Sequence, residues 1–138
     1  MKRCGVFSII FLSFLLAACE APNPAPAAGL GDSYPAPLND PQISVLSADL
    51  RGWLHFSPAV VVRDDGRPLE VQVPVRNIAE RQYNIDYRIL FYDVNGAEVE
   101  PTMGWAFVSL QPKQGVRLKA KALDDRAESY RLEVKWAR

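Results

Sequence analysis

The sequence contains very little histidine and cysteine, on which many catalytic and metal sites depend. His55 is the only histidine, so a catalytic triad or a site of several histidines would have at most one partner. Its surroundings, Trp-Leu-His-Phe-Ser-Pro, contain no nucleophile elbow and no second ligand at metal spacing. We therefore expect no catalytic residue, no metal and no cofactor, and we place His55 in a loop or at the edge of a strand.

Calcium-binding patterns and an excess of charge are also missing. The neighbouring pairs Asp64, Asp65 and Asp124, Asp125 lack the alternating acidic spacing of a calcium loop, and turn chemistry explains them better. The 16 basic and 16 acidic side chains give a formal net charge of zero. Because binding to nucleic acid depends on basic side chains that neutralise phosphates, we expect no nucleic-acid partner.

The amino-terminal segment has the layout of an export signal. Lys2 and Arg3 precede an uncharged apolar run, residues 5–18, that ends in small residues. The run is too short for a membrane span, which needs about 20 apolar residues. Glu20 and several prolines follow it at once. We therefore expect residues 1–18 to be a signal peptide that is removed.

Cys19 stands directly after this signal. The tetrapeptide Leu-Ala-Ala-Cys that ends at Cys19 resembles the lipobox of bacterial lipoproteins, which implies cleavage between Ala18 and Cys19 and a lipid on the Cys19 thiol. Cys4 is removed with the signal, so the mature chain has no second thiol for a disulfide. We expect a membrane anchor at Cys19 and a periplasm-facing protein, and Glu20 leads us to favour the outer membrane over the inner. An ordinary secreted protein is the alternative.

The rest of the chain divides into a tether and one folded domain. Residues 19–42 hold the cysteine and a linker with six prolines, which cannot bury enough apolar surface to fold. In residues 43–138, short alternating apolar runs are separated by turn residues. This pattern predicts an all-β, immunoglobulin-like sandwich of two antiparallel sheets, with a small barrel as the alternative. Seven strands are expected within residues 43–49, 58–63, 69–77, 85–92, 103–110, 115–123 and 130–136.

Several local features of this domain are also expected from the sequence. Pro74 lacks an N–H donor, so its strand should lie at a sheet edge or carry a bulge. The Asn95-Gly96 pair predicts a tight hairpin after Tyr92. The core is expected to rest on the rows of valines and on four aromatic side chains, Phe91, Trp105, Phe107 and Trp136.

Two surfaces are candidates for binding. If the strands within residues 115–123 and 130–136 pair, their outward basic side chains would form a stripe suited to anionic headgroups, glycan or a partner protein. The five residues are Arg117, Lys119, Lys121, Arg131 and Lys135. A solvated outer face is the simpler interpretation of these charges. The aromatic residues of Gly-Trp-Leu-His-Phe and Gly-Trp-Ala-Phe are assigned to the core, with a ligand groove as the alternative.

Residues 83–101 carry the motif Tyr-Arg-x-x-x-Tyr-Asp-x-x-Gly followed by an acidic residue. With this motif the chain resembles the YcfL-like family of periplasmic lipoproteins, a domain of unknown function. The resemblance implies a lipoprotein with an immunoglobulin-like sandwich, and it supplies no catalytic residue. The matching positions are Tyr87, Arg88, Tyr92, Asp93, Gly96 and Glu98.

Taken together, these features favour a non-enzymatic envelope lipoprotein, anchored through Cys19, that binds another envelope protein or a glycan. A structural lipoprotein subunit of an outer-membrane or secretion-system assembly is the alternative. An enzyme is the third and least favoured hypothesis, because no constellation of catalytic residues is present in the sequence.

Overall fold

The structure is a computed structural model that describes residues 40–138. The expected signal peptide, the lipidation site Cys19 and nearly all of the expected tether lie outside the described residues. No helix among residues 40–138 is long and apolar enough to cross a membrane.

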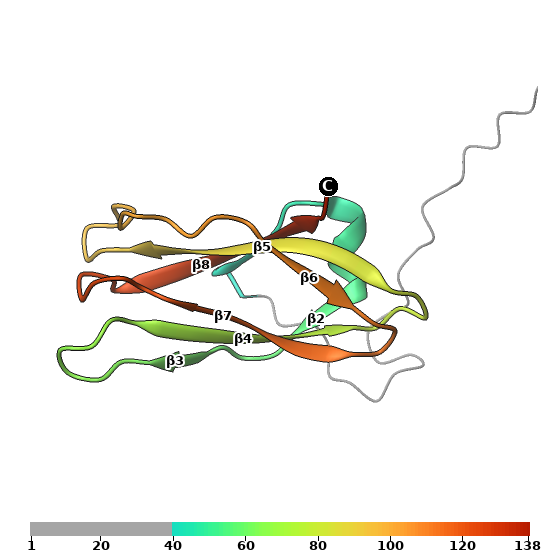
Figure 1. The fold of residues 1–138 in the computed structure, drawn as a ribbon, viewed down its shortest axis with the longest axis horizontal. Helices are drawn as coiled ribbons and strands as arrows, with labels where there is room; N and C mark the ends of the chain where they lie inside the picture. Colours follow the sequence, from blue (N-terminus) through green and yellow to red (C-terminus); the bar gives the residue numbers. More distant parts are fainter. Residues whose placement is uncertain (1–39) are drawn as a thin grey trace, which may run out of the picture.

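Eight strands form two sheets that pack face to face (Figure 1). The β5 sheet has the order β1, β8, β5, β6, and its strands are Ile43–Val45, Ser129–Trp136, Tyr83–Tyr92 and Ala106–Leu110. The β4 sheet is centred on β4, which pairs with β2 and β3 on one side and with β7 on the other. Its strands are β2 (Leu54–Phe56), β3 (Val60–Val62), β4 (Glu70–Asn77) and β7 (Gly115–Lys121).

The predicted all-β, two-sheet sandwich is confirmed, with three differences at its amino-terminal end. The first expected strand is shorter, because β1 ends at Val45 and a 3₁₀ helix, η1 (Ala48–Trp53), follows. Directly after η1 comes β2, which the sequence did not indicate as a strand. The pairing of β1 with β8 is parallel, whereas all other ladders are antiparallel.

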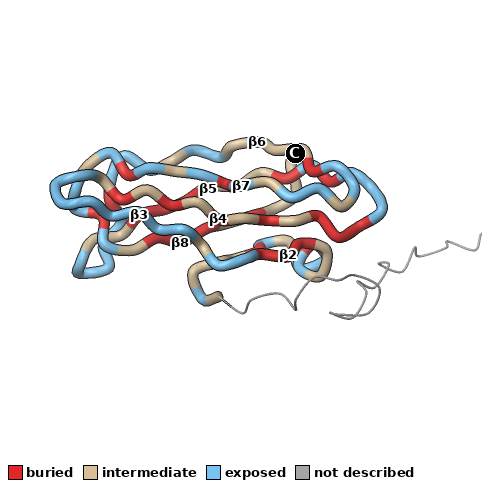
Figure 2. Tube along the Cα trace, turned by 90° about the horizontal axis from the view of Figure 1, so that it is seen from below, coloured by how far each residue is buried: buried red, intermediate tan, exposed pale blue. Residues whose placement is uncertain are grey.

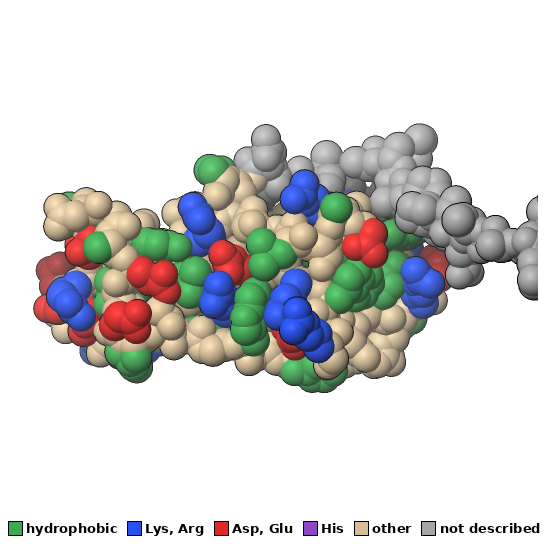
Figure 3. All heavy atoms as spheres, turned by 90° about the horizontal axis from the view of Figure 1, so that it is seen from above, with side chains coloured by type: hydrophobic (Ala, Val, Ile, Leu, Met, Phe, Trp, Pro, Cys, Tyr) green, Lys and Arg blue, Asp and Glu red, His purple; other side chains and the backbone are tan. Residues whose placement is uncertain are grey.

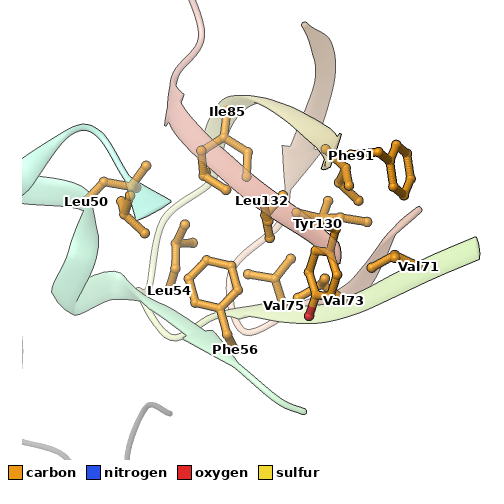
Figure 4. Packing of buried hydrophobic residues seen from close by; sticks show 14 of the residues in the cluster. Leu50, Leu54, Phe56, Val71, Val73, Val75, Ile85, Phe91, Tyr130 and Leu132 are labelled. Carbon is orange, nitrogen blue, oxygen red and sulfur yellow. The ribbon is translucent and has the colours of Figure 1, made fainter. Parts of the chain in front are cut away.

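The core lies between the sheets and follows the alternation of the strands. In β4, Val71, Val73 and Val75 are buried, while the residues between them are only partly covered. Leu50 of η1 and Leu54 of β2 close one end of this core (Figure 4). Figure 2 shows that buried segments run along the strands, while most exposed ones lie in the connections. Each large apolar side chain buried in this way stabilises the folded state by about 1.5–3 kcal/mol.

Two of the four aromatic residues expected in the core lie outside it. Phe91 is buried and Trp136 packs against the core, as expected. Phe107, however, is 62% exposed and Trp105 is 37% exposed. The reason is the register of β6, in which Leu110 pairs with the buried Tyr83 and so turns the even-numbered side chains inward.

Pro74 lies at a bulge, one of the two placements expected, but its strand is central in the sheet. Phe56 of β2 stands opposite Val75, and Val60 of β3 stands opposite Gln72. Residues 57–59 therefore oppose only residues 73 and 74, which makes a bulge between β2 and β3. The N–H of Ser57 donates to the carbonyl of Pro74 at 3.0 Å, and the proline itself has no N–H to satisfy.

The turn expected at Asp64 and Asp65 and the turn expected at Asn95-Gly96 are both present. Gly66 and Gly96 have positive φ values of 72° and 78°, which favour glycine. In the second turn, the Asp93 carboxylate accepts from the N–H groups of Asn95 and Ala97 at 2.8 and 2.9 Å. The hairpin after Tyr92 is brief, because the returning chain makes only a single bridge, at Glu98, before it reaches β6.

Candidate functional site

The expected basic stripe does not form, because its two strands do not pair. The strand β7 pairs with β4, whereas β8 pairs with β5 and β1, so the two strands belong to different sheets. Their outward side chains consequently point away from opposite faces of the sandwich. The structure keeps Arg117, Lys119 and Lys121 together on β7, and it keeps Arg131 and Lys135 together on β8.

The outer face of the β5 sheet instead carries exposed aromatic residues among charged ones. The ladders place Phe107 of β6 opposite Asp86 of β5, and Asp86 opposite Lys135 of β8. In the neighbouring row, Arg88 of β5 stands opposite Glu133 of β8. Figure 3 views the molecule from the β5 side and shows hydrophobic side chains lying between basic and acidic ones.

Trp105 crosses this face from the edge towards the middle of the sheet. It directly precedes β6, which is the edge strand, yet the Nζ of Lys135 on β8 lies 4.1 Å from the centre of its ring. The guanidinium carbon of Arg88 lies 4.6 Å from the same centre. The indole therefore reaches across β5 to contact β8, two strands away from the edge.

The charges around Trp105 hold it in place. The Nε of Arg88 donates to the Glu133 carboxylate at 2.8 Å, and both of these side chains are largely covered. Cation–π contacts contribute about 0.5–1 kcal/mol each at exposed sites. We call this surface the Trp105 face and define it as Asp86, Arg88, Trp105, Phe107, Glu133 and Lys135.

Lys135 is the one residue of this face that belonged to the expected basic stripe, while Trp105 and Phe107 were expected in the core, with a ligand groove only as the alternative. The strand β6 reads Ala-Phe-Val-Ser-Leu. Large apolar residues stand at both odd-numbered and even-numbered positions, so both faces of the strand are apolar and the sequence does not show which one faces the core. The hydrophilic residue Ser109, which shares the outward parity of Phe107, is the signal that could have placed Phe107 outside.

His55 lies in the short edge strand β2, opposite Arg76 of β4, which agrees with the expected position at a strand edge. Asp124 lies in the turn before β8, where the side-chain and backbone N–H groups of Arg126 donate to it and lower the pKa of its carboxyl. This contact fits the expected turn role of the pair. Among residues 40–138, no three His, Cys, Asp or Glu side chains gather closely enough to hold a metal ion.

A family model of proteins of unknown function, DUF1425, matches residues 42–136. The chain belongs to this family. The match covers all eight strands of the sandwich. No curated protein matches the chain.

Two solved structures are similar to this member of the DUF1425 family. A DUF1425 family member from Shewanella sp. PV-4 shares 23% identity and has a TM-score of 0.54, with 62% of this chain and 79% of that chain covered. The protein Cj0090 of Campylobacter jejuni shares 18% identity and has a TM-score of 0.55, with 71% of this chain and all of that chain covered. At these identities the likeness concerns the fold alone.

Proposed function

We propose that this DUF1425 member is a YcfL-like envelope lipoprotein that works by binding and not by catalysis. Its lipid is attached to Cys19, its folded domain faces the periplasm, and its membrane is the outer one. The domain binds another envelope protein through the Trp105 face. The single observation that carries the binding role is the exposure of two aromatic side chains, Trp105 and Phe107, on one sheet face.

The composition of the Trp105 face supports a protein partner. Tryptophan, phenylalanine and arginine are enriched at protein interfaces, and tryptophan and arginine dominate their energetic hot spots. Here, Trp105 is positioned by Arg88 and Lys135, so little side-chain entropy remains to be lost on docking. The face also carries two carboxylates and two cations, a mixture that can be matched by complementary charges on a protein.

Cross-linking in the producing cells tests the binding role. A photo-reactive phenylalanine analogue replaces Phe107 in one strain and Val94 in a control strain, since Val94 is 81% exposed but lies in the turn after β5. We expect a discrete protein adduct from position 107 that is absent from position 94 and severalfold weaker when Trp105→Ala is added. The same adducts from both positions would contradict the proposal. An adduct that disappears after treatment with glycan-degrading enzymes would assign the face to a glycan instead.

The anchor is tested separately. Radiolabelled palmitate should enter the wild-type protein and not the Cys19→Ala variant. Density fractionation of the membranes should then place the labelled protein with the outer membrane. Absence of label from the wild-type protein would end the lipoprotein part of the proposal and leave the binding role of the Trp105 face to the cross-linking experiment.

A further inference from the structure

A groove lies on the outer face of the β4 sheet, beside the bulge that separates β2 from β3. Its volume is about 420 Å³, within the usual range for ligand sites of about 300–1,000 Å³. Apolar atoms make up most of its lining. The residues used below are His55, Ser57, Pro74, Arg76, Gly115 and Arg117.

Two residues leave the outer face of the β4 sheet without long side chains at this point. At the bulge, Pro74 presents a flat ring where a longer side chain would otherwise stand. Beside it, Gly115 of β7 stands opposite Arg76 and has no side chain at all. A Cβ at Gly115 would meet only the carbonyl oxygen of Val75, at an ordinary 3.8 Å, and the φ of this glycine is not positive. The backbone therefore does not require glycine here, and its effect is to leave the groove open.

The charge of the groove is of one sign. Arg76 and Arg117 contribute two guanidinium groups beside the His55 imidazole, and none of the described residues that line the groove carries a carboxylate. The outward carboxylate that β4 does carry, Glu70, stands at the other end of the strand, opposite Lys121. Among the described residues, Arg117 makes no ion pair. The groove thus combines an apolar lining with an arginine, Arg117, whose charge is not balanced by any residue within 40–138.

We propose that this groove binds the carboxyl terminus of a peptide whose last residues are apolar. The guanidinium of Arg117 presents paired N–H donors that match a carboxylate, while the apolar lining receives the terminal side chains. The hydroxyl of Ser57 would serve a peptide amide, whereas a hydrocarbon chain would bury it without a partner. The site lies on the sheet opposite to the Trp105 face, so this proposal does not depend on the proposed function.

A labelled peptide tests the groove directly. The probe is fluorescein-labelled Gly-Ser-Gly-Leu-Val with a free carboxylate, titrated with the full-length chain in detergent and followed by fluorescence anisotropy. We expect saturable binding of this peptide. The same peptide with a carboxy-terminal amide should bind at least tenfold more weakly, because the charge that Arg117 recognises is gone.

Three variants separate the groove from the rest of the sheet. Arg117→Gln should weaken binding of the free-acid peptide about tenfold or more, a loss typical of a charge-assisted hydrogen bond. Lys119→Gln, the matched control, removes the same charge from the next outward position of β7 and should leave binding unchanged. Gly115→Leu should fill the groove and abolish binding while the protein keeps its circular dichroism spectrum and its unfolding temperature.

Several results would overturn the proposal. These are equal binding of the acid and the amide, wild-type affinity in folded Gly115→Leu, an equal loss in Arg117→Gln and Lys119→Gln, or no binding at about 1 mM protein. Decanoate that displaces the peptide at equal concentration would show that the groove recognises an acyl carboxylate and not a peptide terminus.

Discussion

Asn77 joins two connections of the chain from a fully buried position at the end of β4. Its amide nitrogen donates to the carbonyls of Arg81, Leu110 and Gln111 at 2.8–3.2 Å. Its side-chain oxygen accepts from the N–H of Ala79 at 2.9 Å. One side chain therefore satisfies polar backbone groups in both the β4–β5 and the β6–β7 connections.

Replacing Asn77 should therefore be costly. Asn77→Ala leaves the Ala79 N–H and several carbonyls without this partner, and we expect a loss of about 2–4 kcal/mol in the free energy of unfolding. Urea unfolding followed by tryptophan fluorescence measures the change. The control is Asn84→Ala, because Asn84 is exposed and should cost less than about 0.5 kcal/mol. Equal losses in the two variants would contradict this role.

Tyr130 gives the stability of the domain a dependence on alkaline pH. Its side chain points into the core from β8, and burial, followed by the charge of Asp40, raises its pKa above the ordinary value of 10.0 (Figure 4). A raised pKa in the folded state means that stability is full below the unfolded pKa and is lost as the pH rises through the folded pKa.

The free energy of unfolding of the wild type should therefore fall as the pH rises above about 10. Tyr130→Phe removes the titrating group, so its stability should decline less steeply over the same range. Urea unfolding at a series of pH values between about 9 and 11.5 measures both slopes. Parallel slopes would show that other groups cause the alkaline loss.

At the scale of elements, β1 is a short strand with more attachments than its length suggests. Its three residues pair with β8, and the N–H of Leu46 donates to the Val134 carbonyl at 2.8 Å. Beyond it, the indole N–H of Trp136 donates to the Asp49 carboxylate at 3.0 Å. Because of these contacts, β1 shields the backbone groups of β8 that would otherwise form the open edge of the sheet.

Removal of β1 should expose that edge. A chain that begins at residue 47 should unfold at least about 3 kcal/mol more easily than one that begins at residue 40, because it loses the buried Val45 and several hydrogen bonds. It should also self-associate, since an open edge pairs with other strands. Urea unfolding and sedimentation velocity of the two chains measure these effects. Equal stability and a monomeric shorter chain would show that β1 is dispensable.

The sequence predicted elements well where the apolar pattern was one-sided. In β4, valines at every second position left a single possible inward face, and the Asp64, Asp65 pair and Asn95-Gly96 marked their turns. Prediction from the sequence failed where contacts between strands that are distant in the chain decide how a strand pairs or which side of it faces outward. The partner of β7 depends on which sheet the strand joins, and the outward side of β6 depends on its register with β5. The two surfaces argued above depend on such pairings, so the sequence alone did not show where they form.

For the whole molecule, the sandwich places two candidate binding surfaces on opposite sides. The Trp105 face belongs to the β5 sheet, and the groove at Gly115 belongs to the β4 sheet. Because the core separates them, a substitution in one surface should leave binding at the other unchanged. The two proposals together therefore predict that one DUF1425 domain of this kind can hold both partners at once.

The parallel pairing of β1 with β8 also has a mechanical consequence. The chain enters the domain at its amino-terminal side and passes directly into β1, whose hydrogen bonds to β8 lie across the strand direction. A pull directed along β1 would load these bonds together in shear, so they would not open one after another. If the amino terminus is fixed to a membrane while a partner holds the far side of the sandwich, this short strand is the part that bears the tension between them.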